Sequence, residues 1–277
     1  MFGPFTLIDT PGHLPDMQEA TAKEAAVILM LIDGSKPLRD DDRKLFARLQ
    51  ALKRPMLVAL NKADMIRGNP ETAADQLAKD LGIEDVIPIS AITGLNIAAD
   101  LIPALIEASP EAALAIGREL PEFRREAAER LIRNAALVSL AAGMEPIPLV
   151  DIPIILGNQV RLVLRLGAIY GEPLSMQHVR ELLGAMAGGL FFRYLAEEAA
   201  KAVPFGGDLV SGAIAGAGTW AIGWVALEYY ESGKQLTSSQ MRVIFNRIYE
   251  RLRTQQKAGT APRELQTPSH RIPIDKD

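Results

Sequence analysis

The stretch Asn61-Lys62-Ala63-Asp64 follows the apolar run Pro55-Met56-Leu57-Val58-Ala59-Leu60 and decides how the first half of the chain is interpreted. A short apolar run that ends in a polar turn is typical of a buried parallel strand. The carboxyl ends of such strands face the crevice in which open α/β sheets bind their ligands. We therefore expect a binding site at residues 61–64, at one edge of a parallel sheet.

The side chains of this stretch suit a purine base. An ionised Asp64 can accept two hydrogen bonds, from the N1–H and the 2-amino group of guanine, which adenine does not offer in that arrangement. Asn61 can bridge neighbouring loops and reach the other edge of the purine. The aliphatic stem of Lys62 can cover the face of the ring. Asp64 is therefore the candidate residue for selecting guanine.

Two further motifs stand at the ends of predicted strands. Residues 5–8 lead into Asp9-Thr10-Pro11-Gly12, and residues 86–89 lead into Ser90-Ala91-Ile92-Thr93-Gly94. With these three motifs in this order, residues 1–108 resemble the GTP-binding domain of the Era/TrmE-like branch of the translation-factor-related GTPases. The resemblance implies GTP or GDP as ligand, with Mg²⁺.

The resemblance also implies roles for individual residues. Asp9 would hold Mg²⁺ through water, the Gly12 N–H would sense the γ-phosphate, and Ser90 and Ala91 would present their backbone to the guanine O6. The implied nucleotide-binding residues are Asp9, Thr10, Pro11, Gly12, Asn61, Lys62, Asp64, Ser90 and Ala91.

His13 is the candidate catalytic residue because it follows Gly12, where many related enzymes place a side chain that orients the attacking water. Two interpretations stay open, a water-orienting histidine and a switch-loop histidine without a catalytic part.

The phosphate-binding part of such a site is missing from the sequence. A complete GTPase carries a Gly-x-x-x-x-Gly-Lys-Ser/Thr loop whose N–H groups and lysine hold the phosphates. No such loop occurs in the 277 residues. We therefore expect this chain alone to bind GTP weakly or not at all and to be inactive, with GTP hydrolysis belonging to the complete protein. An N-terminally truncated GTPase and a relative that lacks the loop are both open explanations.

The first half alternates between predicted strands and helices, which is typical of a parallel sheet covered by helices. Strands are predicted over 5–9, 26–33, 55–61 and 85–89, and helices over 16–24, 39–52, 70–81 and 95–107. The predicted fold class is α/β, a partial P-loop-NTPase-like parallel sheet over residues 1–108, followed by an all-α, glycine-rich region.

The second half is predicted to be helical. We expect an amphipathic connector helix over 109–145, a helical domain over 146–257 and a disordered tail over 258–277. Pro146-Ile147-Pro148, Gln159 and Gly218-Thr219 resemble the YcjF-type helical domain of unknown function. That resemblance implies a membrane-associated partner domain and supplies no known catalytic residues.

Two interpretations of the apolar stretches stay open. Residues 182–192 and 209–227 carry no charged side chain, and the second stretch, 19 residues long, contains Gly212-x-x-x-Gly216, a spacing that lets helices approach closely. These stretches either contact a membrane or pack tightly within the protein. Residues 234–257 carry six basic side chains against one acidic. This basic helix either faces an anionic membrane surface or docks on its own domain.

Composition narrows the functional classes. The absence of cysteine excludes disulfides and thiolate metal sites. The net charge is −4 overall, and 11 basic against 16 acidic side chains over residues 1–108 argue against a nucleic-acid partner. A strand is predicted to begin within a few residues of Met1, so we expect no secretory signal and a cytoplasmic protein, at the inner face of the membrane if the helices contact one.

The sequence therefore supports two hypotheses. The first is a GTP-binding regulatory protein whose nucleotide state alters how its helical domain packs or engages a membrane or a protein partner. The alternative is a non-enzymatic, membrane-associated or scaffolding protein with a degenerate nucleotide domain.

Overall fold

The computed structural model describes residues 6–10, 15–144, 151–172, 175–186 and 208–257. The chain forms two compact units, a sheet unit over residues 4–115 and a helical unit over residues 116–277. Each unit is described by itself. The predicted disordered tail over 258–277 and part of the predicted apolar stretch 182–192 lie outside the described residues.

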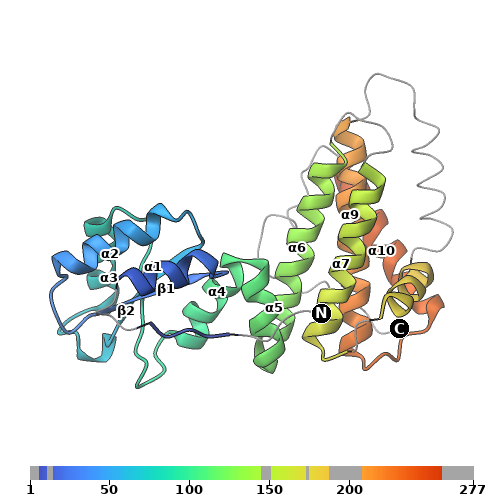
Figure 1. Cartoon of the computed structure of the whole chain (residues 1–277). Helices are drawn as coiled ribbons and strands as arrows, with labels where there is room; N and C mark the ends of the chain where they lie inside the picture. Colours follow the sequence, from blue (N-terminus) through green and yellow to red (C-terminus); the bar gives the residue numbers. More distant parts are fainter. Residues whose placement is uncertain (1–5, 11–14, 145–150, 173–174, 187–207, 258–277) are drawn as a thin grey trace. The chain divides into compact units, whose positions relative to one another are not determined.

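The sheet unit is built on three parallel strands in the order β1-β2-β3 (Figure 1). They are β1 (Ile28–Asp33), β2 (Met56–Asn61) and the short β3 (Ile87–Pro88). The register pairs Asp33, the last residue of β1, with Asn61, the last residue of β2. The α/β fold class predicted from the sequence is thus confirmed, and the polar residues after β1, β2 and β3 meet at one edge of the sheet.

Helices cover both faces of this sheet. Alternate side chains of β1 and β2, such as Ile32 and Val58, pack with Phe46 and Leu77 on one face, while Ala59 packs with Leu101 on the other. The helices of the unit, with the single-turn helices between them, are α1 (Pro15–Glu24), α2 (Asp40–Ala51), η1 (Ala63–Met65), α3 (Pro70–Leu81), η2 (Ile97–Leu101) and α4 (Ile102–Ala108). Each helix predicted for residues 1–108 is present, within a few residues at its ends.

The strand predicted over residues 5–9 is wrong for the part that is described. Residues 6–10 have no regular structure, and the side chains of Leu7 and Ile8 are 83% and 57% exposed. A parallel strand is held by ladder hydrogen bonds to a neighbour and by burial of both faces. Among the described strands none pairs with residues 6–10. This segment therefore has neither the ladder hydrogen bonds nor the burial that would hold it as a strand.

The helix predicted over 109–145 is broken into pieces. The structure has α5 (Pro110–Glu119), the single turn η3 (Pro121–Phe123) and α6 (Arg124–Ala142), and the division between the two units falls inside α5. Pro121 explains the break, because a proline within a helix lacks the N–H for the helical hydrogen bond and clashes with the preceding turn. The domain boundary at 108/109 remains a prediction.

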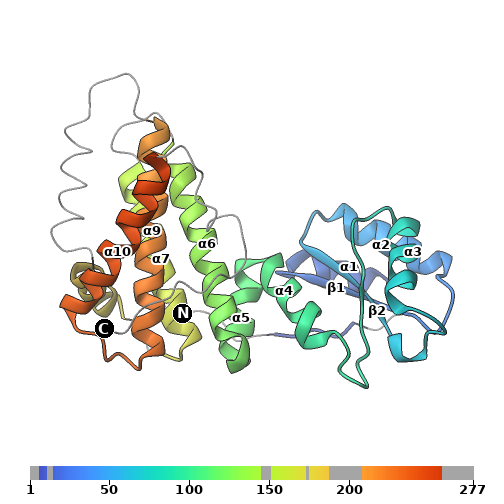
Figure 2. The ribbon, with the colours of Figure 1, turned by 180° about the vertical axis from the view of Figure 1, so that it is seen from behind.

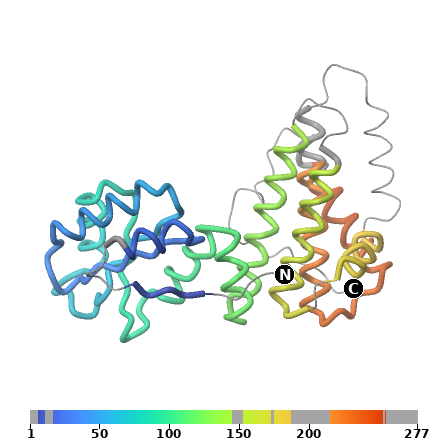
Figure 3. Tube along the Cα trace, in the orientation of Figure 1, coloured from blue at the N-terminus to red at the C-terminus, as the bar shows by residue number. Residues whose placement is uncertain are grey.

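The helical unit is organised around α9 (Asp208–Glu231), which packs against α6, α7 (Asp151–Ile169) and α10 (Ser238–Lys257). The two opposite views show α6, α7 and α9 side by side (Figures 1 and 2), and the Cα tube shows the same three helices (Figure 3). Residues 176–186 are also helical. The apolar face of α10, with Met241, Phe245, Ile248 and Leu252, is buried, so the basic helix docks on its own unit.

Close helix packing explains Gly223 of α9. A Cβ atom on Gly223 would lie 2.7 Å from Cγ1 of Ile132 on α6 and 3.1 Å from Cδ2 of Leu162 on α7. The side chains of Trp220 and Trp224 are buried, so they pack inside the unit. Within the described residues, none of the helices combines the length and hydropathy needed to span a bilayer.

A buried polar network joins three helices of this unit. Thr219 on α9 donates to Ser139 on α6 over 2.8 Å and accepts from the amide of Gln159 on α7 over 3.1 Å. Asn158 also donates to Ser139, over 2.8 Å. Because unpaired polar groups are costly inside a protein, this network favours one register of α6, α7 and α9. Gln159 and Thr219 belong to the residues that carry the YcjF-type resemblance.

A charged cluster joins α6 and α9. Arg125 of α6 contacts Glu129 at 3.2 Å, Glu231 at 2.5 Å and Glu228 at 3.8 Å, and its guanidinium lies over the ring of Trp224. Burial nevertheless raises the pKa of Glu129, because desolvation of its carboxylate outweighs the attraction of Arg125.

Candidate functional site

The candidate site lies where β2 ends. Asn61 is the last residue of β2, Lys62 follows it, and Ala63 and Asp64 open the short helix η1. The chain changes direction here because Lys62 adopts the left-handed conformation, with φ of 64°. The Ala63 N–H donates to the carbonyl of Ile89 over 2.9 Å. The stretch after β2 is thus held against the stretch after β3.

Asn61 makes the bridge between neighbouring loops that the sequence predicts. Its Oδ1 accepts hydrogen bonds from the N–H of Lys62 over 2.8 Å and from the N–H of Ala91 over 3.0 Å. One amide side chain therefore fixes the loop after β2 to the loop after β3. Whether the backbone of Ser90 and Ala91 faces the guanine O6 remains a prediction.

Asp64 is held by Ser90. The Ser90 hydroxyl donates to Oδ1 of Asp64 over 2.5 Å and accepts from the N–H of Thr93 over 3.2 Å. The Ser90 side chain is completely buried, whereas Asp64 is exposed. The buried Ser90 hydroxyl thus orients the Asp64 carboxylate, which is exposed and accessible to a ligand. The role of the Ser90 hydroxyl was not predicted, because the family resemblance implies a role for its backbone only.

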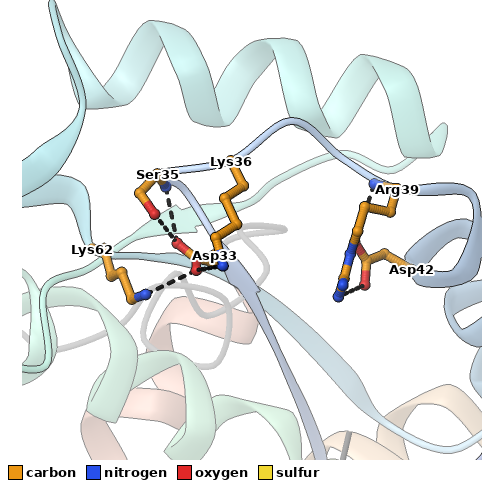
Figure 4. Close-up of polar contacts among 6 residues, drawn as sticks. All are labelled: Asp33, Ser35, Lys36, Arg39, Asp42 and Lys62. Carbon is orange, nitrogen blue, oxygen red and sulfur yellow. Dashed lines mark hydrogen bonds and ion pairs between the residues drawn. The ribbon is translucent and has the colours of Figure 1, made fainter. Parts of the chain in front are cut away.

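Lys62 reaches across to β1. Its ammonium donates to Oδ2 of Asp33 over 2.8 Å, while the N–H and hydroxyl of Ser35 donate to Oδ1 of Asp33 over 3.0 and 2.6 Å. Figure 4 shows Lys62, Ser35 and Lys36 converging on this carboxylate, and a separate pair formed by Arg39 and Asp42. These hydrogen bonds, that of Lys62 foremost, hold the pKa of Asp33 well below its usual range.

Asp33 is a site residue that the sequence analysis missed. Asp33 and Gly34 carry a turn signal, and nothing in a single sequence says which strand lies beside β2. The signal that would find Asp33 is its position as the last residue of an apolar strand, which the parallel register then places opposite Asn61. Gly34 completes the contact, since its N–H donates to the Asn61 carbonyl over 2.8 Å and a Cβ would lie only 2.9 Å from that oxygen.

The structure therefore brings together five of the predicted residues, Asn61, Lys62, Asp64, Ser90 and Ala91, at the carboxyl edge of the sheet. Asp9 is exposed and Thr10 is half-buried, both in a segment without regular structure. Pro11, Gly12 and the candidate catalytic residue His13 lie outside the described residues. The roles predicted for these residues remain predictions.

The side chains at this edge of the sheet have the chemistry that the guanine prediction requires. Asp64 offers an exposed carboxylate for the N1–H and 2-amino edge, and Lys62 offers an aliphatic stem for the ring face. Within the described residues, no group of three or more acidic or histidine side chains could hold a metal ion. The role of Asp9 in holding Mg²⁺ remains a prediction.

Comparison with known proteins agrees with the division into two units. Residues 4–111 match the family described as the elongation factor Tu GTP-binding domain, and residues 108–254 match a domain of unknown function, DUF697. No solved structure matches the chain.

Individual relatives fall into two groups. The chain is 30% identical over 147 residues to magnetosome membrane protein 22 of Magnetospirillum gryphiswaldense, covering 49% of this chain and 72% of that protein. It is 30% identical to GTPase Der of Moorella thermoacetica over 54% of this chain, and 33% identical to the mitochondrial translation factor GUF1 of Eremothecium gossypii over 38%. The matches span only 35% and 17% of those two proteins. These similarities support a GTP-binding protein.

Proposed function

The chain belongs to the DUF697 family through residues 108–254. Because it also carries the sheet unit, we propose that the chain is the guanine-recognising part of a regulatory GTP-binding protein. The observation that carries this proposal is Asp64, exposed and oriented by the buried Ser90 hydroxyl. In the proposed complex the Asp64 carboxylate accepts from the N1–H and the 2-amino group of guanine. Asn61 keeps the two loops at the spacing this requires.

The phosphate-binding half is not part of the proposed activity of this chain. The printed sequence contains no Gly-x-x-x-x-Gly-Lys-Ser/Thr loop, so we propose that this loop comes from polypeptide outside it. Hydrolysis, Mg²⁺ binding through Asp9 and the orienting of water by His13 then belong to the complete protein. Comparing the hydrolysis rate of a His13→Ala variant of the complete protein with that of its parent tests the last role. Membership of the Era/TrmE-like branch and kinship with YcjF-type domains are also part of this proposal.

The experiment that tests base recognition compares guanosine, inosine and adenosine as ligands of the full chain. Inosine lacks the 2-amino group, so removal of one charge-assisted hydrogen bond is expected to weaken binding roughly tenfold. Adenosine is expected to bind more weakly still, because its N1 carries no hydrogen to donate. Chemical-shift titration measures such weak affinities.

The Asp64→Ala variant supplies the decisive arm of that experiment. It is expected to bind guanosine and inosine equally, whereas Asp75→Ala, an exposed aspartate of α3, keeps the preference of the parent chain. Equal affinity of the parent chain for the three nucleosides would contradict the proposal.

Membrane association of the helical unit is the second candidate, and it includes the non-enzymatic scaffolding alternative. The similarity to a magnetosome membrane protein favours it, together with the exposed Arg242, Arg247 and Arg251 of α10. Anionic lipids attract such basic helices at low salt. The full chain is then expected to float with vesicles of phosphatidylserine and phosphatidylcholine and to be released by salt. Absence from the vesicle fraction at low salt would contradict it.

A further inference from the structure

Lys62 is fixed at both ends. Its backbone is in the left-handed conformation, with φ of 64°, and its ammonium bonds to Asp33 at 2.8 Å. A lysine side chain on a surface otherwise samples many rotamers, and restricting it costs conformational entropy before a ligand arrives. In this chain part of that restriction is already present without a ligand. Figure 4 shows the side chain extending from its loop to the end of β1.

The turn that holds Lys62 is itself docked on the site. The Gly34 N–H donates to the Asn61 carbonyl over 2.8 Å, and Ser35 supplies two hydrogen bonds to Asp33. Asp33 therefore keeps a fixed orientation independently of Lys62. The hydrogen bonds from Lys62 and Ser35 lower the pKa of Asp33, which favours the carboxylate form that accepts them.

We propose that Asp33 is a positioning residue of the guanine site, which anchors the Lys62 ammonium so that the lysine stem forms a preformed wall against the face of the purine. This inference rests on the proposed function. Asp33 does not touch the base in this arrangement; it acts through Lys62. A wall against the ring face is indifferent to the substituents on the ring edge, so Asp33 raises the affinity for guanosine and inosine by the same factor.

A double-mutant cycle in the full chain tests this role. Asp33→Asn is expected to weaken the binding of guanosine and of inosine equally, by roughly three- to tenfold, which lies in the lower part of the range of couplings between contacting residues. In a Lys62→Met background, which keeps the stem and removes the charge, Asp33→Asn is expected to have no further effect. Asp42→Asn is the matched control, because it breaks the neighbouring pair with Arg39 and leaves Asp33 alone.

Two results would overturn the inference. One is an equal loss of affinity on Asp33→Asn with and without the Lys62 charge, because that is the signature of a structural role through the Ser35 turn. The other is a changed ratio of guanosine to inosine affinity, because that would place Asp33 at the edge of the base.

A measurement without nucleotide separates this inference from the proposed function. In ¹³Cε-labelled lysine spectra, the Lys62 signal, assigned by its loss in Lys62→Met, is expected to show restricted motion in the parent chain and free motion in Asp33→Asn. If the parent chain binds no guanosine but Lys62 is ordered by Asp33, only the proposed function fails. Equal mobility of Lys62 in both proteins overturns the positioning role itself.

Discussion

At the scale of single residues, the site depends on hydrogen bonds that orient one exposed carboxylate. Ser90 lies completely buried beneath Asp64 and joins it to the Thr93 N–H. A buried hydroxyl in such a position has two effects, since it restricts the carboxylate and satisfies a backbone donor. In the proposed site, Ser90 would therefore contribute to guanine specificity without contacting the ligand.

The Ser90→Ala variant separates these effects. Loss of the hydroxyl leaves the Thr93 N–H without this acceptor and is expected to lower the free energy of unfolding of the sheet unit by about 1–3 kcal/mol. The released Asp64 carboxylate is expected to discriminate guanosine from inosine less well than in the parent chain. Nucleoside titration and hydrogen exchange of β2 amides measure the two effects. Thr72→Ala on α3 is the exposed control, and an unchanged guanosine-to-inosine ratio in Ser90→Ala would contradict this role.

The Asp64→Asn variant is expected to exchange one base for another. An asparagine amide can accept from the N1–H of xanthine and donate to its 2-oxo group, whereas it meets the 2-amino group of guanine with a donor. Titration with xanthosine and guanosine is expected to show a reversed preference. A variant that still prefers guanosine would show that the carboxylate does not read this edge of the base.

Sequence reasoning reaches the site only in part. Asn61, Lys62 and Asp64 were predicted from the residues that follow an apolar strand, and Ser90 and Ala91 from the resemblance to GTP-binding domains. Asp33 was missed because its contact with Lys62 depends on two features that the sequence does not show. These are the pairing of β1 with β2 and the left-handed backbone conformation of Lys62. The placement of β1 beside β2 is determined by the tertiary structure and not by the local sequence.

At the scale of helices and strands, α9 depends on glycine where another helix comes close. Gly223→Ala places a methyl group 2.7 Å from Ile132 and is expected to destabilise the helical unit by about 1–3 kcal/mol through overpacking. Gly218→Ala on the same helix meets nothing within 4 Å and is expected to stabilise it by about 1 kcal/mol, the helix propensity difference.

Tryptophan fluorescence during urea unfolding measures this pair of variants. The two tryptophans of the chain, Trp220 and Trp224, both lie in α9, so the signal reports on the helical unit. Equal effects of the two substitutions would contradict the account of α9 packing.

The charged cluster of α6 and α9 predicts a dependence of stability on pH. The pKa of Glu129 is raised above its ordinary value of 4.5 in the folded unit, so the folded state holds this proton more tightly than the unfolded chain does. Its contribution to stability is therefore present below the ordinary pKa and is lost as the pH rises through the raised value. Between pH 4 and pH 7 the parent chain is expected to lose stability relative to Glu129→Gln.

Urea unfolding followed by tryptophan fluorescence at each pH measures that difference. A parent chain that instead gains stability over Glu129→Gln with rising pH would show that the ion pair with Arg125 outweighs the burial of the carboxylate.

Elements differ in how well the sequence predicts them, for local reasons. Helix α3 has the ends that were predicted, and the structure shows the local reason, because Asn69 caps it, Pro70 opens it and Gly82 closes it in a left-handed conformation. The strand predicted over 5–9 is wrong over the described residues 6–9, because a strand needs a neighbouring strand, which no local pattern supplies. The amphipathic pattern after residue 109 correctly predicts helix, but α6 is a central helix of its unit, with Ala128, Ile132 and Ala136 also buried.

At the scale of the whole molecule, the chain combines a sheet unit that carries the proposed guanine-recognising residues with a helical unit of the DUF697 family. Strand order and side chains within the described residues bring these proposed residues together. The loop that holds phosphates in GTPases is absent from the sequence. The central claim is therefore that this chain recognises the base and not the phosphates.

The most direct test is the affinity of the full chain for the series guanosine, GMP, GDP and GTP, with and without Mg²⁺. The predicted result is weak binding that changes little along the series and does not depend on Mg²⁺, together with a preference over the adenosine series. Micromolar, Mg²⁺-dependent binding of GTP would contradict the account, and so would the absence of any preference for guanine.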